Sequence, residues 1–438
     1  MISLKEKYQK AKQNKNEKEI LKEYQEIIQT KTENEEEIKI KEETIIEIGE
    51  IFAKLGFGEN IKNLMDSLQD FFLQLPKART AKIVRKLIEL INQIPNSIDL
   101  QIHVCSHWID WAKKEKRSYL RQRLESKLAS LYLENTNFQM ALTTITNLAK
   151  EVKKLDDKLL LIEVNLIETK IHIELKNIPK AKASLTSART SANAVYCPPL
   201  LQSEMDKLSG ILHIHEQDFK TAFSYFFESF EGYSTIVLDP KLKKKYSDNI
   251  VGQTKFKFIE KEAISTLKYM LLTKIMMEHP EEIHGIVNGK VASKFTGREI
   301  DCIVKISEAY SERSLHKFNE AIKEYDKELQ EDPIIKNLLN SLYETMLEQN
   351  LLRLIEPFSR VEISHIADLI KLDTKTVETK LSQMILDKKF EGILDQGAGC
   401  LIIYDETIPD ETYKLSIEIM ENLNVVIGSL YQKAKGLN

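Results

Sequence analysis

Apolar residues recur every three or four positions along most of the chain, which is the spacing of one face of an α-helix. Several of these predicted helices form pairs that share one spacing of residues, which we call the register. It begins with a small residue, and a large residue stands three positions after it. An apolar residue comes nine positions after the small one, and an alanine comes twelve positions after it. The register holds over Ala129–Ala141, Thr169–Ala181 and Gly210–Ala222, which begin forty and then forty-one residues apart.

This register has a mechanical meaning. Small residues allow two antiparallel helices to approach closely, and the larger apolar residue fills the remaining gap. One such pair cannot bury its apolar face alone, so several pairs must stack. We therefore predict an all-α architecture, a right-handed TPR-like α-solenoid, although its period exceeds the usual ~34 residues. An apolar stripe within Ile20–Ile28 extends the prediction toward the N-terminus.

The pattern changes over residues 350–405, where short elements replace the long helix pairs. A helix ending near Ile370 and a second one starting at Thr374 precede two short strands, Gly392–Asp395 and Cys400–Tyr404. A glycine-containing turn joins the strands. This order of elements predicts a small winged helix (α+β), a fold best known for reading DNA.

The charges of this segment argue against nucleic acid. Residues 350–405 hold 7 lysines and arginines against 9 aspartates and glutamates. A phosphate-binding face needs clustered cations that release counterions from the backbone. The winged helix is therefore expected to hold protein. A winged-helix nucleic-acid-binding protein remains the alternative, which a mobility-shift test on the isolated domain would decide.

A long helix is predicted after this domain, within residues 409–438. Its apolar residues cover two adjacent stripes, a face wider than one packing partner requires. Such a surplus suggests a bundle with helices of other chains, the alternative being that the helix folds back on its own winged helix. The candidate partner-binding residues are Ile419, Leu423, Val426, Leu430 and Tyr431 of this helix, with Ile393, Leu394 and Ile402 of the strands.

Composition supports a mostly helical protein without a membrane span. Only 14 glycines and 10 prolines occur in 438 residues, about half the usual share. The four cysteines form no spaced pair, which fits free thiols in a reducing compartment. Neither a signal peptide nor a run of roughly 18 apolar residues is recognised. With a net charge of −4, the expectation is a soluble intracellular protein that binds neither nucleic acid nor membrane.

Two motifs could carry chemistry, and neither is complete. His103 and His107 have helical spacing for zinc, but no acidic residue lies between them and no second ligand pair follows. Gly285–Lys290 resembles a phosphate loop but has three residues between its glycines instead of four, and Val291 follows the lysine. The sequence predicts no catalytic residue, no metal and no cofactor, hence no enzyme.

Several motifs resemble a known family. Glu356–Val361, Lys380–Phe390 and Gly392–Gly397 resemble the PCI module shared by the proteasome lid, the signalosome and an initiation factor. The closing Ser429–Lys435 and the upstream Tyr196–Pro199 narrow the resemblance to the PCI-domain lid subunits of the 26S proteasome. The resemblance covers nearly the whole chain and is weakest over the first hundred residues. A signalosome PCI scaffold subunit is the nearest alternative.

The resemblance implies a non-catalytic scaffold that clamps lid to base and core particle for ubiquitin-dependent degradation. In that family, winged helices pack side by side into a horseshoe, and terminal helices gather into a bundle that positions the deubiquitinating lid subunit. The helical-repeat arm reaches an ATPase subunit of the base and an alpha subunit of the core particle. Other lid PCI subunits are thus implied partners, and the implied location is cytoplasmic and nuclear.

The resemblance also marks residues 235–260 as an insertion, because this lysine-rich connection is about twenty residues shorter in the resembled subunit. We expect it to be an exposed loop, the alternative being a contact with an acidic partner. The expected domains are then as follows: residues 1–234, solenoid; 235–260, inserted loop; 261–349, helical part of the PCI module; 350–405, winged helix; 409–438, C-terminal bundle helix.

Overall fold

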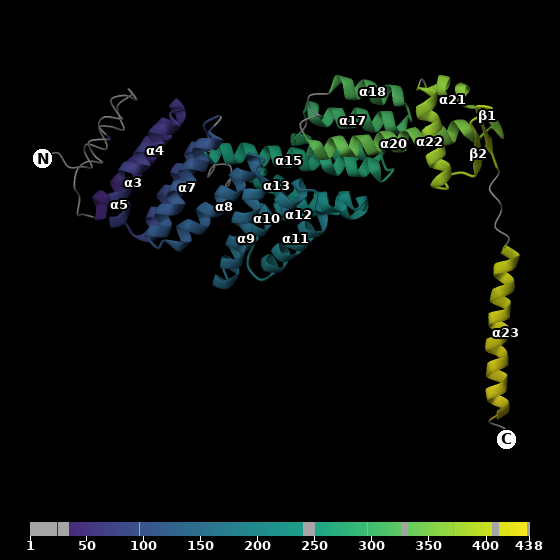
Figure 1. Cartoon of the computed structure of the whole chain (residues 1–438), viewed down its shortest axis with the longest axis horizontal. Coiled ribbons are helices and arrows are strands. Elements are labelled where there is room, and N and C mark those ends of the chain that lie inside the picture. Colours follow the sequence, from purple (N-terminus) through teal and green to yellow (C-terminus); the bar gives the residue numbers. More distant parts are fainter. Residues whose placement is uncertain are drawn as a thin grey trace. The chain divides into compact units, whose positions relative to one another are not determined.

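The computed structural model describes residues 24, 35–95, 97–239, 250–295, 297–325, 329, 332–370, 372–404 and 411–435. The chain divides into two compact units, Met1–Ser307 and Glu308–Asn438. The first unit is helical, and the second adds a small sheet to its helices (Figure 1). The predicted fold class, a helical solenoid followed by a winged helix, is confirmed.

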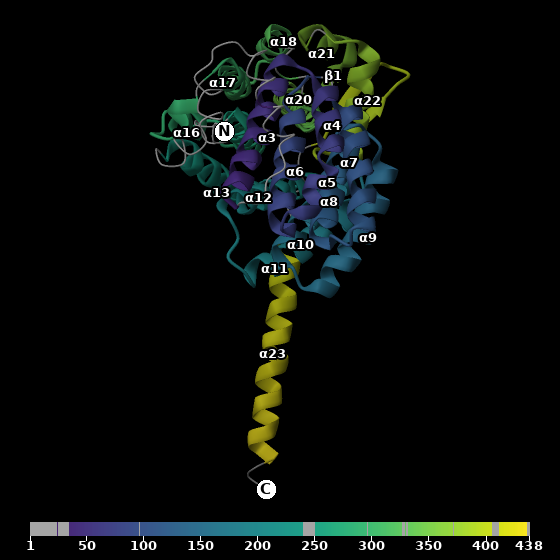
Figure 2. The same cartoon turned by 90° about the vertical axis from the view of Figure 1, so that its left-hand side faces the viewer.

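The first unit stacks successive helices along the chain (Figure 1), and Figure 2 views these helices from the end at which α3 lies. Its described helices are α3 (Glu35–Leu55), α4 (Gly58–Ser67), α5 (Gln69–Gln74), α6 (Lys77–Ile91), α7 (Ile98–Lys114), α8 (Ser118–Glu134), α9 (Phe138–Leu155), α10 (Lys158–Glu174), α11 (Ile178–Asn193), α12 (Pro199–His215), α13 (Phe219–Leu238), α15 (Ile250–Met276), α16 (Glu282–Val287), the 3₁₀ helix η1 (Ala292–Phe295) and α17 (Arg298–Ser311), which continues into the second unit.

One turn recurs between the paired helices. Each first helix ends with a non-glycine residue at positive φ, and the next residue donates its backbone N–H to a carbonyl five positions earlier. This is the hydrogen bond of a Schellman cap. The left-handed residues are Thr136 (φ 59°), Lys176 (φ 56°), Gln217 (φ 62°) and Arg313 (φ 53°). The corresponding N–H to O distances are 2.9, 2.8, 3.0 and 3.0 Å.

The predicted repeat register matches the packing. The small residues Ala129, Thr169 and Gly210 are all buried, and so is the alanine twelve positions after each of them. They lie on the pairs α8–α9, α10–α11 and α12–α13, whose helices contact each other. Of the stripe predicted within Ile20–Ile28, only Tyr24 is described. It is buried and donates its hydroxyl to Glu47 at 2.6 Å, while the other residues of the stripe lie outside the described part.

Gly210 gives a direct test of this packing. A Cβ atom placed there would lie 2.6 Å from the ring of the buried Phe226. Gly210→Ala should gain about 0.5–1 kcal/mol of helix propensity but lose about 1–3 kcal/mol to overpacking. Net destabilisation is expected in a thermal melt. Gly285→Ala in α16 is the matched control, because nothing lies within 4 Å of its Cβ position and only the propensity gain remains. Equal melting shifts for the two variants would refute the register.

A series of ion pairs connects the first helices of successive repeats. Each internal helix of the series carries an acidic residue that pairs with the helix before it and a basic residue that pairs with the helix after it. We call this series the charge ladder. Its pairs are Arg123–Glu163 (α8 to α10), Lys170–Glu204 (α10 to α12), Lys207–Glu262 (α12 to α15) and Lys268–Glu299 (α15 to α17).

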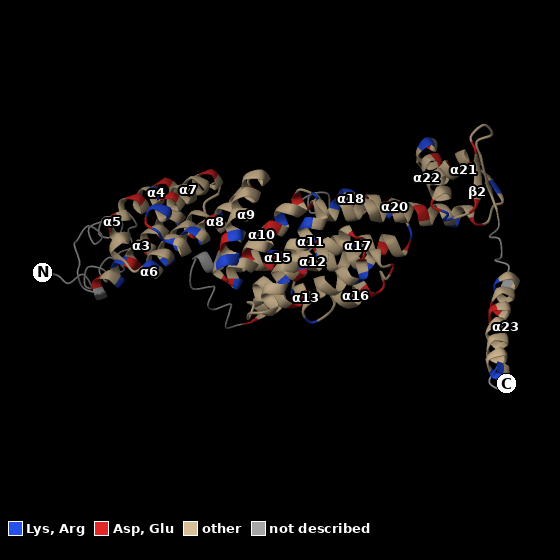
Figure 3. Ribbon diagram, turned by 60° about the horizontal axis from the view of Figure 1, so that its bottom comes forward, with Lys and Arg blue, Asp and Glu red and all other residues tan. Residues whose placement is uncertain are grey.

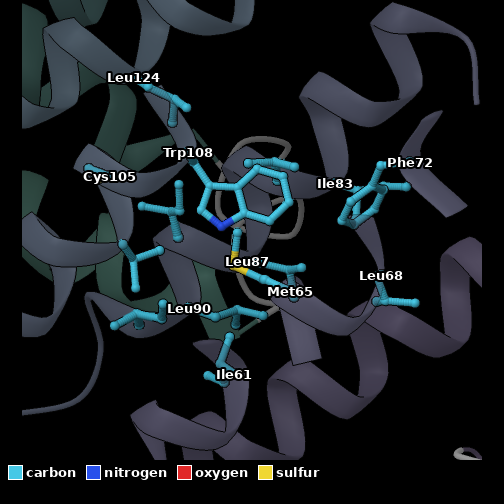
Figure 4. Packing of buried hydrophobic residues seen from close by; sticks show 14 of the residues in the cluster. Ile61, Met65, Leu68, Phe72, Ile83, Leu87, Leu90, Cys105, Trp108 and Leu124 are labelled. Carbon is cyan, nitrogen blue, oxygen red and sulfur yellow. The ribbon is translucent and has the colours of Figure 1, made fainter. Parts of the chain in front are cut away.

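The N-terminal helices of the first unit share one apolar core around Trp108. This side chain is fully buried and meets the ring of Phe72 edge-on, with 5.7 Å between ring centroids. Met65 and Leu87 pack nearby, from α4 and α6 (Figure 4). The core therefore joins helices from α3 to α8 into one packed body.

The expected loop at 235–260 is partly wrong. Helix α13 continues to Leu238, and α15 already begins at Ile250. Ile259, in the first half of α15, is buried. This part of the helix therefore packs against the fold although its sequence is rich in lysine. Lys241–Lys245, the basic cluster of the predicted loop, lie outside the described residues.

The second unit contains the winged helix. Its further described elements are α18 (Leu315–Glu324), α20 (Pro333–Ile355), β1 (Arg360–Glu362), α21 (Ile363–Ile370), α22 (Thr374–Leu386), β2 (Gly392–Asp395), β3 (Cys400–Ile403) and α23 (Glu411–Lys435). The antiparallel sheet has the order β1-β3-β2. Residues of α20, α21, α22 and the sheet form its core, among them Leu351, Ile366, Leu381 and Leu401.

Candidate protein-binding surfaces

The register of the sheet divides the predicted strand residues between two faces. Opposite residues of an antiparallel pair lie on the same face. Val361, Leu401 and Leu394 form one row across the three strands, and it packs on the core of the winged helix. Leu394 therefore serves the domain's own core.

The next row faces away from that core. It contains Arg360, Ile402 and Ile393. Ile393 is 52% exposed, and Ile402 is half-buried. This row, which we call the outer row, presents two isoleucines beside an arginine on the face of the sheet opposite to the core.

Strand β2 also presents an edge. Among the described residues, β2 pairs only with β3. The Tyr404 N–H donates to the Glu391 carbonyl at 2.9 Å, so these two opposite residues form a hydrogen-bonded pair between the strands. Because the pattern alternates, the backbone groups of Gly392 and Leu394 point away from β3. They could pair with a strand of another chain.

Helix α23 carries many exposed apolar side chains. Every side chain described in it, from 412 to 435, is exposed. Ile419, Leu423, Val426 and Leu430 are 53–60% exposed, and Tyr431 is 70% exposed. Figure 3 shows most of the helix uncharged, with basic residues near both of its ends and acidic residues between them. The five predicted residues recur at helical spacing and define what we call the α23 face.

Catalytic chemistry finds little support among the described residues. Burial raises the pKa of the Cys105 thiol to about 12. Burial, and to a smaller extent the negative charge of Asp206, raises the pKa of the Cys197 thiol, so both groups disfavour the reactive thiolate form. His107 lies 3.6 Å from Asp66 and 3.3 Å from Gln69. No group of three potential metal ligands occurs in the described part of the chain.

The phosphate-loop resemblance is structural coincidence. Gly285 lies inside α16, which ends at Val287, so its backbone is helical and does not form a cradle after a strand. In the segments that the structure describes, no helix is both long and apolar enough to span a bilayer.

The outer row could not be predicted from the sequence because it depends on pairing between distant segments. Strand β1 has three residues, too few to show an alternating pattern, and it exists through its pairing with β3. The placement of Ile393 and Leu394 on opposite faces follows from alternation. Which face is buried follows only from the three-dimensional packing.

Known proteins match the chain over nearly its whole length. The family model described as 26S proteasome regulatory subunit RPN6 N-terminal domain matches residues 3–135, and the PCI domain model matches 322–405. A 26S proteasome non-ATPase regulatory subunit 11 homolog of Arabidopsis thaliana is 45% identical over 408 residues, covering 93% of this chain and 92% of the relative.

Two further relatives agree. The 26S proteasome non-ATPase regulatory subunit 11 of Dictyostelium discoideum is 47% identical, covering 91% of this chain and 92% of the relative. The 26S proteasome regulatory subunit RPN6 of Saccharomyces cerevisiae is 42% identical, covering 91% and 88%. The chain therefore belongs to the PCI-domain family of 26S proteasome non-ATPase regulatory subunit 11.

Proposed function

We propose that this chain is a non-catalytic scaffold subunit of the proteasome regulatory-particle lid. The observation that carries the proposal is the α23 face, a row of exposed apolar side chains on a helix that follows a finished domain. Burying one Val, Leu or Ile side chain contributes about 1.5–3 kcal/mol, so the four aliphatic residues of this face would hold the chain in a complex when buried in a helical bundle. The bundle partners would be other lid subunits, among them the deubiquitinating subunit.

The winged helix would provide a second contact. The outer row and the unpaired edge of β2 suit a neighbouring PCI subunit that adds its own strand or packs on the isoleucines. The domain would thereby take its place in a row of winged helices. The charge balance of this domain supports a protein partner over nucleic acid.

The repeat arm would provide the third contact. We assign it to an ATPase subunit of the base and an alpha subunit of the core particle, as the family resemblance implies. Such contacts would clamp lid, base and core while ubiquitylated substrate is processed, and no step would require a catalytic group of this chain. The corresponding location is cytoplasmic and nuclear.

A pair of substitutions on β2 separates assembly from folding. Ile393→Asp should leave the melting temperature nearly unchanged and weaken incorporation into the lid, because Ile393 faces solvent. Leu394→Asp should unfold the winged helix, because it places a charge against the core. Affinity purification with mass spectrometry of co-purifying subunits, together with thermal melts, measures both effects. Full incorporation of Ile393→Asp would remove the outer row from the proposal.

A further inference from the structure

A groove opens in the second unit beside α18, α20 and α21. It has a volume of about 660 Å³. Its apolar lining includes Leu354 and Leu369, and Leu369 is 53% exposed. The three helices follow one another closely in the sequence, and Figure 1 shows them as neighbours within this unit. An exposed leucine in a concave site indicates room for an apolar side chain of a ligand.

A second cavity continues the first. It has a volume of about 500 Å³ and reaches Phe390 and Ile403 of the winged helix. Arg313 and Arg353 line both cavities. Two hollows with mixed polar and apolar linings therefore flank the same pair of arginines, which is the layout of a site for an elongated ligand rather than for a compact small molecule.

The rim of the groove is basic. Arg313, Lys323 and Arg353 are exposed, and none of them forms an ion pair with another described residue. The acidic residues of the two linings are Glu320, which lies 3.4 Å from His316, and Glu356. The three cations outnumber these two acids, and the lining is partly apolar, so the site favours a ligand that carries carboxylates and apolar side chains.

The backbone of Arg313 is fixed at a turn. Arg313 is the left-handed residue of the turn between α17 and α18, where the N–H of Arg313 bonds Tyr310 and that of Ser314 bonds Ala309, both at 3.0 Å. The planar guanidinium presents its N–H donors in a fork that matches the geometry of a carboxylate. Arg353, on α20, is likewise mounted on a helix.

We propose that this groove, which we call the arginine groove, binds an acidic linear segment of another polypeptide. Arg313 and Arg353 would receive its carboxylates, and the two hollows would receive apolar side chains on either side. This interaction is separate from the α23 face and the outer row, so it stands whether or not those surfaces act in lid assembly.

The test uses the full-length chain and a fluorescein-labelled peptide of Asp and Glu residues interrupted by leucines. Fluorescence anisotropy should show saturable binding that weakens about tenfold or more in the double variant Arg313→Glu/Arg353→Glu. Lys336→Glu is the matched control, because it makes the same kind of charge change at an exposed site on α20 outside the groove, and it should bind as the parent does.

Three probes decide the chemistry of the ligand. Replacing the acidic residues of the peptide by lysine, or its leucines by serine, should abolish binding. Absence of binding by the acidic peptide, or unchanged binding by the double variant, would overturn the proposal. Equal binding of a labelled single-stranded oligonucleotide would overturn it as well, because the groove would then select for phosphate charge alone.

Discussion

A chain that ends at Asp405 is expected to fold and yet to be missing from assembled lid particles. The core of the second unit is formed by residues of α20, α21, α22 and the sheet, and no described residue of α23 belongs to it. Removing α23 therefore costs the domain little stability. It removes the α23 face, whose apolar side chains would be buried only in a complex.

Native gels of lid assembled with the truncated chain give the measurement, and circular dichroism confirms that the chain is folded. A full-length chain with Glu418→Gln and Glu421→Gln is the control, since it changes the charge of α23 and keeps its apolar residues. The control should assemble normally. Normal assembly of the truncated chain would refute the role of the α23 face.

The largest stability loss is expected for Trp108→Ala. Trp108 is fully buried among residues of several helices, so the substitution leaves a cavity that its neighbours fill only in part. Losses of about 3–5 kcal/mol are typical of such changes. Because each repeat contacts mainly its neighbours, the destabilisation should be concentrated in α3–α8 rather than spread over the chain.

Amide hydrogen exchange resolves this prediction by region. Protection should fall across α3–α8 in the Trp108→Ala chain, while the winged helix keeps its exchange rates. Tyr196→Ala is the matched control, because the Tyr196 side chain is 81% exposed and its loss should cost little. Uniform loss of protection over both units would contradict a solenoid built from local contacts.

The sequence predicted what depends on local pattern. Paired helices follow from apolar spacing, and the buried positions 141, 181 and 222 follow from the recurring alanine. The apolar spacing and the recurring alanine can both be recognised within about forty consecutive residues, so neither requires knowledge of the three-dimensional fold. The start of α15 was missed because composition near residue 250 is polar and lysine-rich, while the contact that stabilises the helix there comes from the fold.

Features that join distant residues could not be predicted. Arg123 and Glu163 are 40 positions apart, and Lys207 and Glu262 are 55 apart. Nothing in a charged surface pattern tells which acid meets which base. The arginine groove likewise needs α18, α20 and α21 to come together before its two arginines share a site.

The charge ladder also bears on how the number of helical repeats in the first unit could change. Every internal helix of the ladder accepts from one neighbour and donates to the next, so the helices join head to tail with a fixed polarity, as α10 does through Glu163 and Lys170. A duplicated or deleted repeat would bring or remove one acid and one base together. The base of the preceding helix would still meet the acid of the following helix, so no charge would be left unpaired. The ladder is therefore compatible with the insertion of whole repeats, in evolution or by design.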